Sequence, residues 1–203
     1  MKSRARLAFL ALGAVAVSSA FANEELVSFS ARKDTTFTAI LTYRPESPPA
    51  YVAVLDAARR FPNVPVIVIG HSNSTQSAAY VAAVEQKKIQ GIVLIEGRFA
   101  WINYNDKFFD GNGLSKFDWS SIKVPVLIIQ HRKDDCFAMP YEAAAKVAEH
   151  NRAFQFVTID PPGSVATGEC TYKGTHNLVG QETVVADDML DWFKAMVKGE
   201  AAH

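Results

Sequence analysis

Continuous apolar segments of strand length alternate with helix-like segments along this chain, and this alternation constrains the fold more than any other feature. Strands whose apolar residues are continuous rather than alternating are typical of a parallel sheet that is covered on both faces. The predicted strands span residues 36–43, 64–70, 91–97, 124–131 and 154–159, and residues 25–32 are a candidate edge strand.

The segments between these strands carry the signals of helices. The predicted helices span residues 50–61, 77–88, 141–150 and 182–197. Prolines directly precede the first and the third of them, which is common at the start of a helix. Strands that alternate with helices form right-handed β-α-β crossovers. We therefore predict an α/β fold with three layers, in which an open, mostly parallel sheet has helices on both faces.

The first 22 residues have the pattern of a secretory signal peptide. Three basic residues precede the apolar residues 7–17, and small residues lead to a predicted cleavage site after Ala22. The apolar run is shorter than the roughly 20 residues that a membrane span needs, and no later segment qualifies. We therefore expect an exported protein, periplasmic or secreted, without stable membrane insertion. Its mature part, residues 23–203, is predicted to form a single domain.

The charge balance argues against nucleic acid as a partner. The chain has 21 basic and 21 acidic residues, and removal of residues 1–22 takes away three basic ones, which leaves a formal charge of −3. No block or stripe of basic residues is present. Sequence motifs for zinc and for nucleotide phosphates are also missing, so we expect neither a metal nor a cofactor. The alternative is a metal site that draws on His131, Asp134 and Asp135.

The segment "GHSNS", residues 70–74, joins a predicted strand to a predicted helix. A tight turn at such a join exposes a serine hydroxyl, and the helix N-terminus offers backbone N–H groups to a developing oxyanion. Ser72 is therefore a candidate nucleophile. Gly70 has the small side chain that the turn requires, whereas Ser74 stands where a glycine is usual. The alternative is that Ser72 is only the N-cap of the helix.

Two carboxylates follow the strand at residues 124–131. Asp134 and Asp135 lie in a loop at the carboxyl edge of the predicted sheet, where one of them could orient an imidazole. The alternative is a solvated loop whose Asp135 caps the helix that begins near Pro140. The residues alone leave this choice open.

The base is predicted largely by elimination among five histidines. His203 is terminal, and His150 ends a helix at the amino edge of the sheet. His71 neighbours Ser72 in sequence, but we expect its side chain to point elsewhere, and we expect His131 to pack or to line a pocket. His176 lies in the loop between the strand at residues 154–159 and the last helix, above the same edge as Ser72 and Asp134.

The order Ser72, Asp134, His176 along the chain is the order of the α/β-hydrolase fold. The segments "VIVIGHSNST", "VPVLIIQHRKDDC" and "CTYKGTH" resemble α/β-hydrolases, and more narrowly a group of exported bacterial serine hydrolases, over residues 36–198. The resemblance implies that Asp134 rather than Asp135 is the acid. It also implies that the backbone N–H of Asn73 binds the oxyanion.

Cys136 and Cys170 both lie in the exported part, where an oxidising compartment lets a disulfide persist. The residues alone also allow two separate buried thiols. In the group that the chain resembles, a bridge between these positions holds the acid loop to the base loop, so the resemblance implies a Cys136–Cys170 disulfide.

The chain departs from the family before the nucleophile. Typical members place two or three strands and a glycine-rich loop there, and that loop donates the second oxyanion N–H. Here only 49 residues separate Ala22 from Ser72, with no glycine before Gly70. The nearest substitute is the segment 41–49, where Tyr43, Arg44 or Ser47 could supply a donor. Loss of one oxyanion donor costs roughly 100-fold to 1000-fold in turnover.

An aromatic-rich insertion, residues 98–119, leaves the carboxyl end of the strand at residues 91–97. It is either a lid that lines a substrate site or a segment that buries its own small cluster. His71, Phe99 and Trp101 are candidates for residues that line the substrate.

Together these features predict a serine-dependent hydrolase of small acyl esters or thioesters that works through an acyl-enzyme. Ser72 would attack, His176 would take and return the proton, and Asp134 would orient the imidazole. The expected partner is a small-molecule acyl substrate. The alternative, motivated by the short N-terminal half, is a catalytically weak or inactive binding domain of the same fold.

Overall fold

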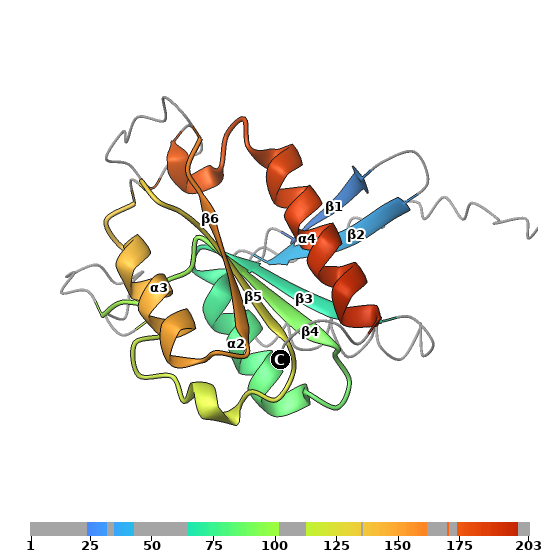
Figure 1. Ribbon diagram of the computed structural model, residues 1–203, viewed down its shortest axis with the longest axis horizontal. Helices are drawn as coiled ribbons and strands as arrows, with labels where there is room; N and C mark the ends of the chain where they lie inside the picture. The colour runs from blue at the N-terminus through green and yellow to red at the C-terminus, as the bar shows by residue number, and fades with distance from the viewer. Residues whose placement is uncertain are drawn as a thin grey trace, which may run out of the picture.

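The computed structural model describes residues 24–31, 35–42, 65–101, 113–134, 136–161, 170 and 174–198. The centre of the molecule is a sheet of four parallel strands in the order β3-β4-β5-β6 (Figure 1). These strands are β3 (Ile67–His71), β4 (Gly91–Ile95), β5 (Val126–His131) and β6 (Phe154–Ile159). All four match predicted strands, with differences of a few residues at their ends.

Helices cover both faces of this sheet, as predicted. The helices are α2 (Ser74–Glu85), α3 (Tyr141–His150) and α4 (Glu182–Val197). Ile92 and Leu94 of β4 belong to a core cluster with alanines of α2 and α3. Val93 and Ile95 belong to a second cluster with Val185 and Trp192 of α4. Because successive side chains of a strand point to opposite faces, α2 and α3 lie on one face and α4 on the other.

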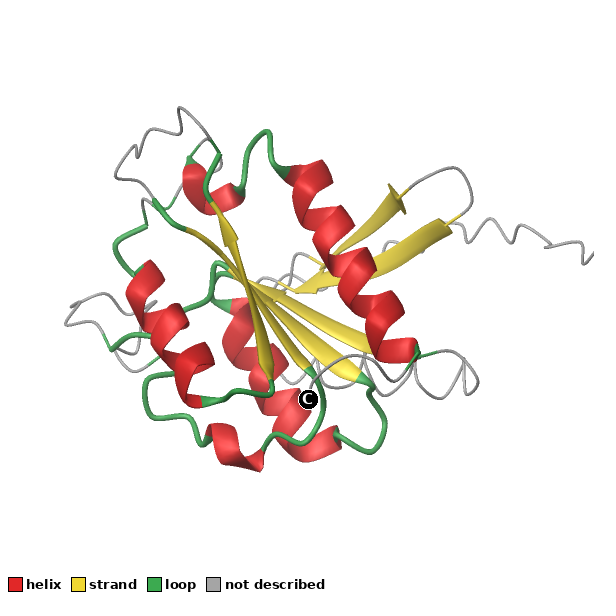
Figure 2. Ribbon diagram, viewed as in Figure 1, coloured by secondary structure: helices red, strands yellow, loops and turns green. Residues whose placement is uncertain are grey.

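The N-terminal strands differ from the prediction. β1 (Glu24–Ala31) and β2 (Thr35–Thr42) pair with each other antiparallel and form a separate two-stranded sheet next to β3 (Figure 2). Residues 25–32 are therefore not an edge strand of the main sheet, and the strand predicted at residues 36–43 is not one of its parallel strands. The physical reason is the connection of three residues between them, which allows a hairpin but is far too short for a parallel crossover.

Part of the aromatic-rich insertion belongs to the core. Phe99 is buried, with its ring centroid 5.8 Å from that of Trp119, and Trp119 also packs against Phe117 and Phe154 at 4.7 and 5.7 Å. For these residues the second alternative, burial within a cluster, describes the structure. The middle of the insertion lies outside the described residues.

Two further predictions also fall outside the described part of the chain, namely the signal peptide at residues 1–22 and the helix at residues 50–61. Among the helices that are described, none is long and apolar enough to cross a membrane.

Candidate active site

Ser72 lies on the sharp turn between β3 and α2. Its φ of 57° is in the left-handed region, which is uncommon for a residue with a side chain and typical of strained functional turns. The Ser72 N–H donates to the carbonyl of Ile95 at 2.9 Å, and the Ser72 carbonyl accepts from the Thr75 hydroxyl at 2.7 Å. Hydrogen bonds on both sides of the serine thus hold the strained conformation.

Gly70 is required by the close approach of the helix to the strand. A Cβ atom at this position would lie 2.7 Å from the carbonyl oxygen of Ser74 and 2.9 Å from the Cβ of Ala78. Ser74, which stands where a glycine is usual, fits the turn. Its hydroxyl accepts from the His71 N–H at 2.8 Å and donates to the His71 carbonyl at 2.7 Å. Serine in place of glycine at position 74 therefore adds two hydrogen bonds to the turn and causes no steric conflict.

The N-cap alternative for Ser72 is wrong, because the residue at the cap of α2 is Asn73. The Ser72 hydroxyl makes a long-range contact instead, with the Nε2 atom of His176 at 2.9 Å.

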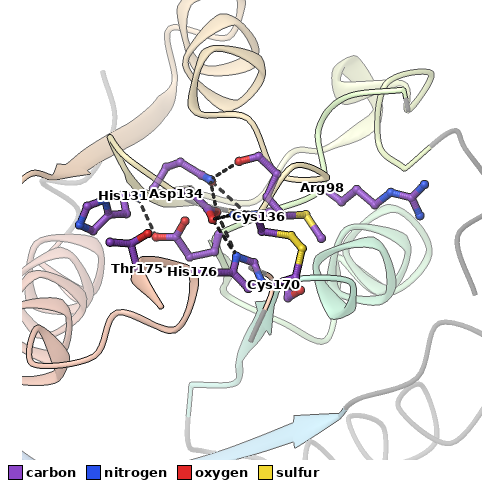
Figure 3. Close-up of polar contacts among 12 residues, drawn as sticks. Arg98, His131, Asp134, Cys136, Cys170, Thr175 and His176 are labelled. Atoms are coloured by element: carbon purple, nitrogen blue, oxygen red, sulfur yellow. Dashed lines mark hydrogen bonds and ion pairs between the residues drawn. A yellow bond between two sulfur atoms is a disulfide. The ribbon is translucent and has the colours of Figure 1, made fainter. Parts of the chain in front are cut away.

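His176 connects the serine to an acid. Its Nδ1 atom lies 3.1 Å from Oδ1 and 3.0 Å from Oδ2 of Asp134. A carboxylate accepts, so Nδ1 carries the proton and Nε2 is the acceptor for the Ser72 hydroxyl. Both side chains are buried, with 3% of His176 and none of Asp134 exposed. The structure thus brings Ser72, Asp134 and His176 into one hydrogen-bonded series, and Figure 3 shows the last two side by side.

Asp134 is itself held by three neighbours. Its Oδ1 accepts from the Cys136 N–H at 2.8 Å, and its Oδ2 accepts from the side-chain amide of Gln130 at 3.1 Å. The Asp134 N–H donates to the carbonyl of His131 at 3.1 Å. These bonds leave the carboxylate little freedom other than to face His176.

Gln130 was missed by the sequence analysis. It is fully buried, accepts from the Gly97 N–H at 3.1 Å, and donates to the carbonyl of Met139 at 3.0 Å as well as to Asp134. The sequence did contain a signal for Gln130, namely a single amide side chain within an otherwise apolar strand. A buried polar group of this kind needs hydrogen-bond partners, which indicates a structural role.

The Cys136–Cys170 disulfide is present, as the resemblance implied. It joins the loop of Asp134 to the segment that precedes His176 (Figure 3). The same two segments are also joined by a hydrogen bond, which the Thr175 hydroxyl donates to the carbonyl of Lys133 at 2.6 Å. The acid loop and the base loop are therefore connected both covalently and by a hydrogen bond.

His71 does not point away from the site, contrary to our expectation. Its ring centroid lies 5.2 Å from that of His176, and its Nε2 donates to the backbone carbonyl of His176 at 3.0 Å. Burial, and then the neighbouring His176, lower the pKa of His71 to about 4. His71 is therefore neutral near pH 7 and supports the base loop, because its contacts are to that loop.

The other candidates for residues that line the substrate or bind the oxyanion lie in different surroundings. Phe99 is buried in the core cluster, whereas Trp101 is 57% exposed. Asn73 follows Ser72 directly, at the N-terminus of α2, where backbone N–H groups and the helix dipole favour an anion. The proposed second donors, Tyr43, Arg44 and Ser47, fall outside the described residues.

Glu96 is the other residue that the sequence analysis missed. It follows β4 directly, is fully buried, and accepts from the His131 N–H at 2.7 Å. His131 is buried as well, and its Nδ1 accepts from the Lys133 N–H at 2.9 Å. The available signal for Glu96 was a carboxylate placed immediately after an apolar strand at the carboxyl edge.

Three of the described residues could together hold a metal ion, and only Asp134 among them belongs to the metal site considered from the sequence. One possible ligand atom each from Glu96, Asp134 and His176 lie within 4.8 Å of one another. Asp135 is not described. Since both ring nitrogens of His176 already face Asp134 and Ser72, a metal bound here would have to break that series.

Comparisons with known proteins resolve the fold. No protein-family model matches the chain, and no curated protein matches it. Among solved structures, BpoC from Mycobacterium tuberculosis H37Rv superposes with a TM-score of 0.52 over 76% of each chain, at 12% sequence identity. The chain has the α/β-hydrolase fold.

Two further structures are similar at lower scores. Est1E from Butyrivibrio proteoclasticus has a TM-score of 0.46 at 20% identity, over 70% of this chain and 67% of Est1E. An alpha/beta superfamily hydrolase from Oenococcus oeni PSU-1 has a TM-score of 0.46 at 15% identity, over 75% and 76% of the two chains. Within the described residues, the α/β-hydrolase fold is represented by four parallel strands with the strand-turn-helix of Ser72 at their carboxyl edge.

Proposed function

We propose that this protein is a serine hydrolase that cleaves small acyl esters or thioesters through an acyl-enzyme. The observation that carries the proposal is the series of contacts from Ser72 Oγ through His176 to Asp134, at 2.9 and 3.0 Å. A serine, an imidazole in the correct tautomer and a buried acid are the groups that nucleophilic acyl transfer requires.

In the first half of the reaction, the Ser72 oxygen attacks the acyl carbon and its proton moves to Nε2 of His176. The substrate carbonyl oxygen becomes negative and accepts from the Asn73 N–H. The proton on Nε2 then passes to the departing alcohol or thiol as the bond to the acyl carbon breaks, which leaves the acyl group on Ser72.

In the second half, a water molecule replaces the departed group. His176 takes a proton from the water, the resulting hydroxide attacks the acyl carbon, and Nε2 returns the proton to the Ser72 oxygen as the acid leaves. Asp134 keeps the Nδ1 proton in place throughout and stabilises the transient imidazolium. Each half of the reaction therefore requires Nε2 of His176 to accept a proton and then to give it up.

Labelling with a fluorophosphonate tests the proposal directly. We expect covalent attachment at Ser72, lost in Ser72→Ala and in His176→Ala, and unchanged in Ser120→Ala, a control on an exposed serine. A folded, disulfide-intact protein that is not labelled would instead favour the binding domain. A panel of short and long p-nitrophenyl esters would then define the acyl group that is preferred.

We also infer that the protein is exported. The pattern of residues 1–22 supports this, and so does the disulfide, since such bonds persist in oxidising compartments. In a bacterial host that expresses the full chain, the expected product lies outside the cytoplasm and begins at Asn23. A product that keeps residues 1–22 in the cytoplasm would contradict the inference.

A further inference from the structure

Glu96 occupies a costly position in the fold. Its φ of 47° is in the left-handed region that glycine adopts freely and a residue with a side chain does not. Its carboxyl group is also fully buried, which is unfavourable for a charged or polar side chain. A residue that served only packing would be a glycine or an apolar side chain, so both features indicate a role for the carboxylate.

The backbone of this turn holds Glu96 against the strand that carries the acid. The Glu96 N–H donates to the carbonyl of Ile129 at 2.9 Å, and Glu96 Oε1 accepts from the His131 N–H at 2.7 Å. The next residue, Gly97, donates to Gln130, whose amide bonds to Asp134. Glu96 therefore lies at the end of β4, between the strand that leads to Ser72 and the strand that leads to Asp134.

The carboxylate is close enough to act on the imidazole. One oxygen of Glu96, one oxygen of Asp134 and one ring nitrogen of His176 lie within 4.8 Å of one another. A hydrogen bond between nitrogen and oxygen is about 2.9 Å long, so a movement of about 2 Å would bring Glu96 into contact with the ring.

We propose that Glu96 is a second positioning carboxylate for His176, which takes over the orientation of the imidazole when Asp134 is lost. This inference depends on the proposed function, since it concerns the same base. In the intact site Asp134 bonds to Nδ1 of His176, and the Glu96 carboxyl group lies close enough to both groups to replace Asp134.

The simpler alternative is that Glu96 only accepts the hydrogen bond from the His131 backbone. Glu96→Gln separates the two roles, because glutamine keeps the shape and the acceptor oxygen but has no charge. A purely structural role would therefore be preserved in this variant, and an electrostatic role would be lost.

The test is a double-mutant cycle with Asp134→Ala and Glu96→Gln. For each variant, the rate of fluorophosphonate labelling of Ser72 and the kcat and KM for p-nitrophenyl acetate would be measured. Loss of the orienting acid lowers kcat about 10⁴-fold in serine proteases. We expect Asp134→Ala to lose only about 100-fold to 1000-fold, and the double variant to lose about 10⁴-fold. KM should change by less than about 2-fold, because neither residue contacts substrate.

Two further variants sharpen the cycle. Glu149→Gln in the Asp134→Ala background removes the same charge from an exposed position on α3 and should change nothing. Glu96→Asp in that background keeps a carboxylate and should retain more activity than Glu96→Gln.

Two results would overturn the inference: a loss of about 10⁴-fold in Asp134→Ala alone, or an effect of Glu96→Gln that is the same with and without Asp134. If Glu96→Gln does not fold, two measurements still test the role of Glu96. These are the loss of kcat in Asp134→Ala and the effect of Glu96→Asp in that background. A wild-type protein that is not labelled would overturn the proposed function and this inference together, whereas a labelled wild type with an additive cycle would overturn only the role of Glu96.

Discussion

The two halves of the candidate active site are built in different ways. The nucleophile turn, residues 70–75, is held mainly by bonds between residues three apart, such as those of Ser74 with His71 and of Thr75 with Ser72. The acid and base loops are instead held by contacts between residues 34 to 42 apart, including the disulfide and the bond from Thr175 to Lys133. Ser72 is thus held mainly by local contacts, whereas His176 is positioned by contacts between residues far apart in the chain.

This difference predicts how each half responds to damage. A change in the turn should act on the strand-helix join itself and affect stability. A change in the loops should separate His176 from Ser72 while the turn stays intact. The following experiments test this contrast, from the largest expected effect to the smallest.

Ser72→Ala and His176→Ala should each reduce kcat by about 10⁶-fold, since either change removes a group that acts with the other as a unit. The double variant should lose hardly more than either single one, measured with a p-nitrophenyl ester. Thermal unfolding of both variants should resemble that of the wild type, because alanine at position 72 keeps the backbone hydrogen bonds that hold the turn. Losses that multiply in the double variant would show that the two halves act independently.

Removal of the disulfide should lower the free energy of unfolding by about 2–4 kcal/mol and reduce activity. Cys136→Ser/Cys170→Ser, or wild type in reductant, would be compared by thermal unfolding and esterase assay. Because the damage is confined to the acid and base loops, amide hydrogen exchange in α2 should stay slow relative to the loops. Equal loss of protection in α2 and in the loops would contradict the separation of the two halves.

Gly70→Ala should destabilise the protein by about 1–3 kcal/mol, because the new methyl group would overlap the backbone of α2 at 2.7 to 2.8 Å. Gly180→Ala is the matched control, since a Cβ there meets nothing within 4 Å and only its φ of 79° is strained. Denaturant unfolding of the two variants measures the difference. A Gly70→Ala protein as stable as wild type would argue against the tight turn.

His71→Gln should reduce the sensitivity of stability to acid. The pKa of His71 is lowered to about 4, mainly by burial, so the unfolded chain takes up a proton between about pH 6.5 and pH 4 that the folded chain does not. The stability that wild type has above pH 6.5 is therefore lost as the pH falls through this window, by about 1–3 kcal/mol.

Glutamine keeps a donor for the carbonyl of His176 but does not titrate in this range. The expected result is a flatter dependence of the unfolding free energy on pH between 6.5 and 4 in His71→Gln. Curves for wild type and variant that run parallel through that window would refute the assignment.

Several features of this fold and site could be predicted from short stretches of sequence. Continuous apolar runs specified the four parallel strands, since burial on both faces leaves no polar positions. The turn at Ser72 was also predictable, because its small residues and the helix that follows are all local. His71 was not, since the direction of its side chain depends on where the loop of His176 lies.

The amino-acid sequence by itself indicated Ser72, His176 and an acid in the loop of Asp134 and Asp135, because residue type and position at strand ends determine which edge of a parallel sheet these side chains reach. The choice of Asp134 over Asp135 and the pairing of Cys136 with Cys170 came from the resemblance to a family. Only the tertiary structure decided which polar groups support the catalytic side chains: Gln130 beneath Asp134, His71 beneath the base loop, and Glu96 within reach of His176. The physical reason is that a buried polar group takes whatever partner lies opposite it in space, and separation along the chain carries little information about that partner.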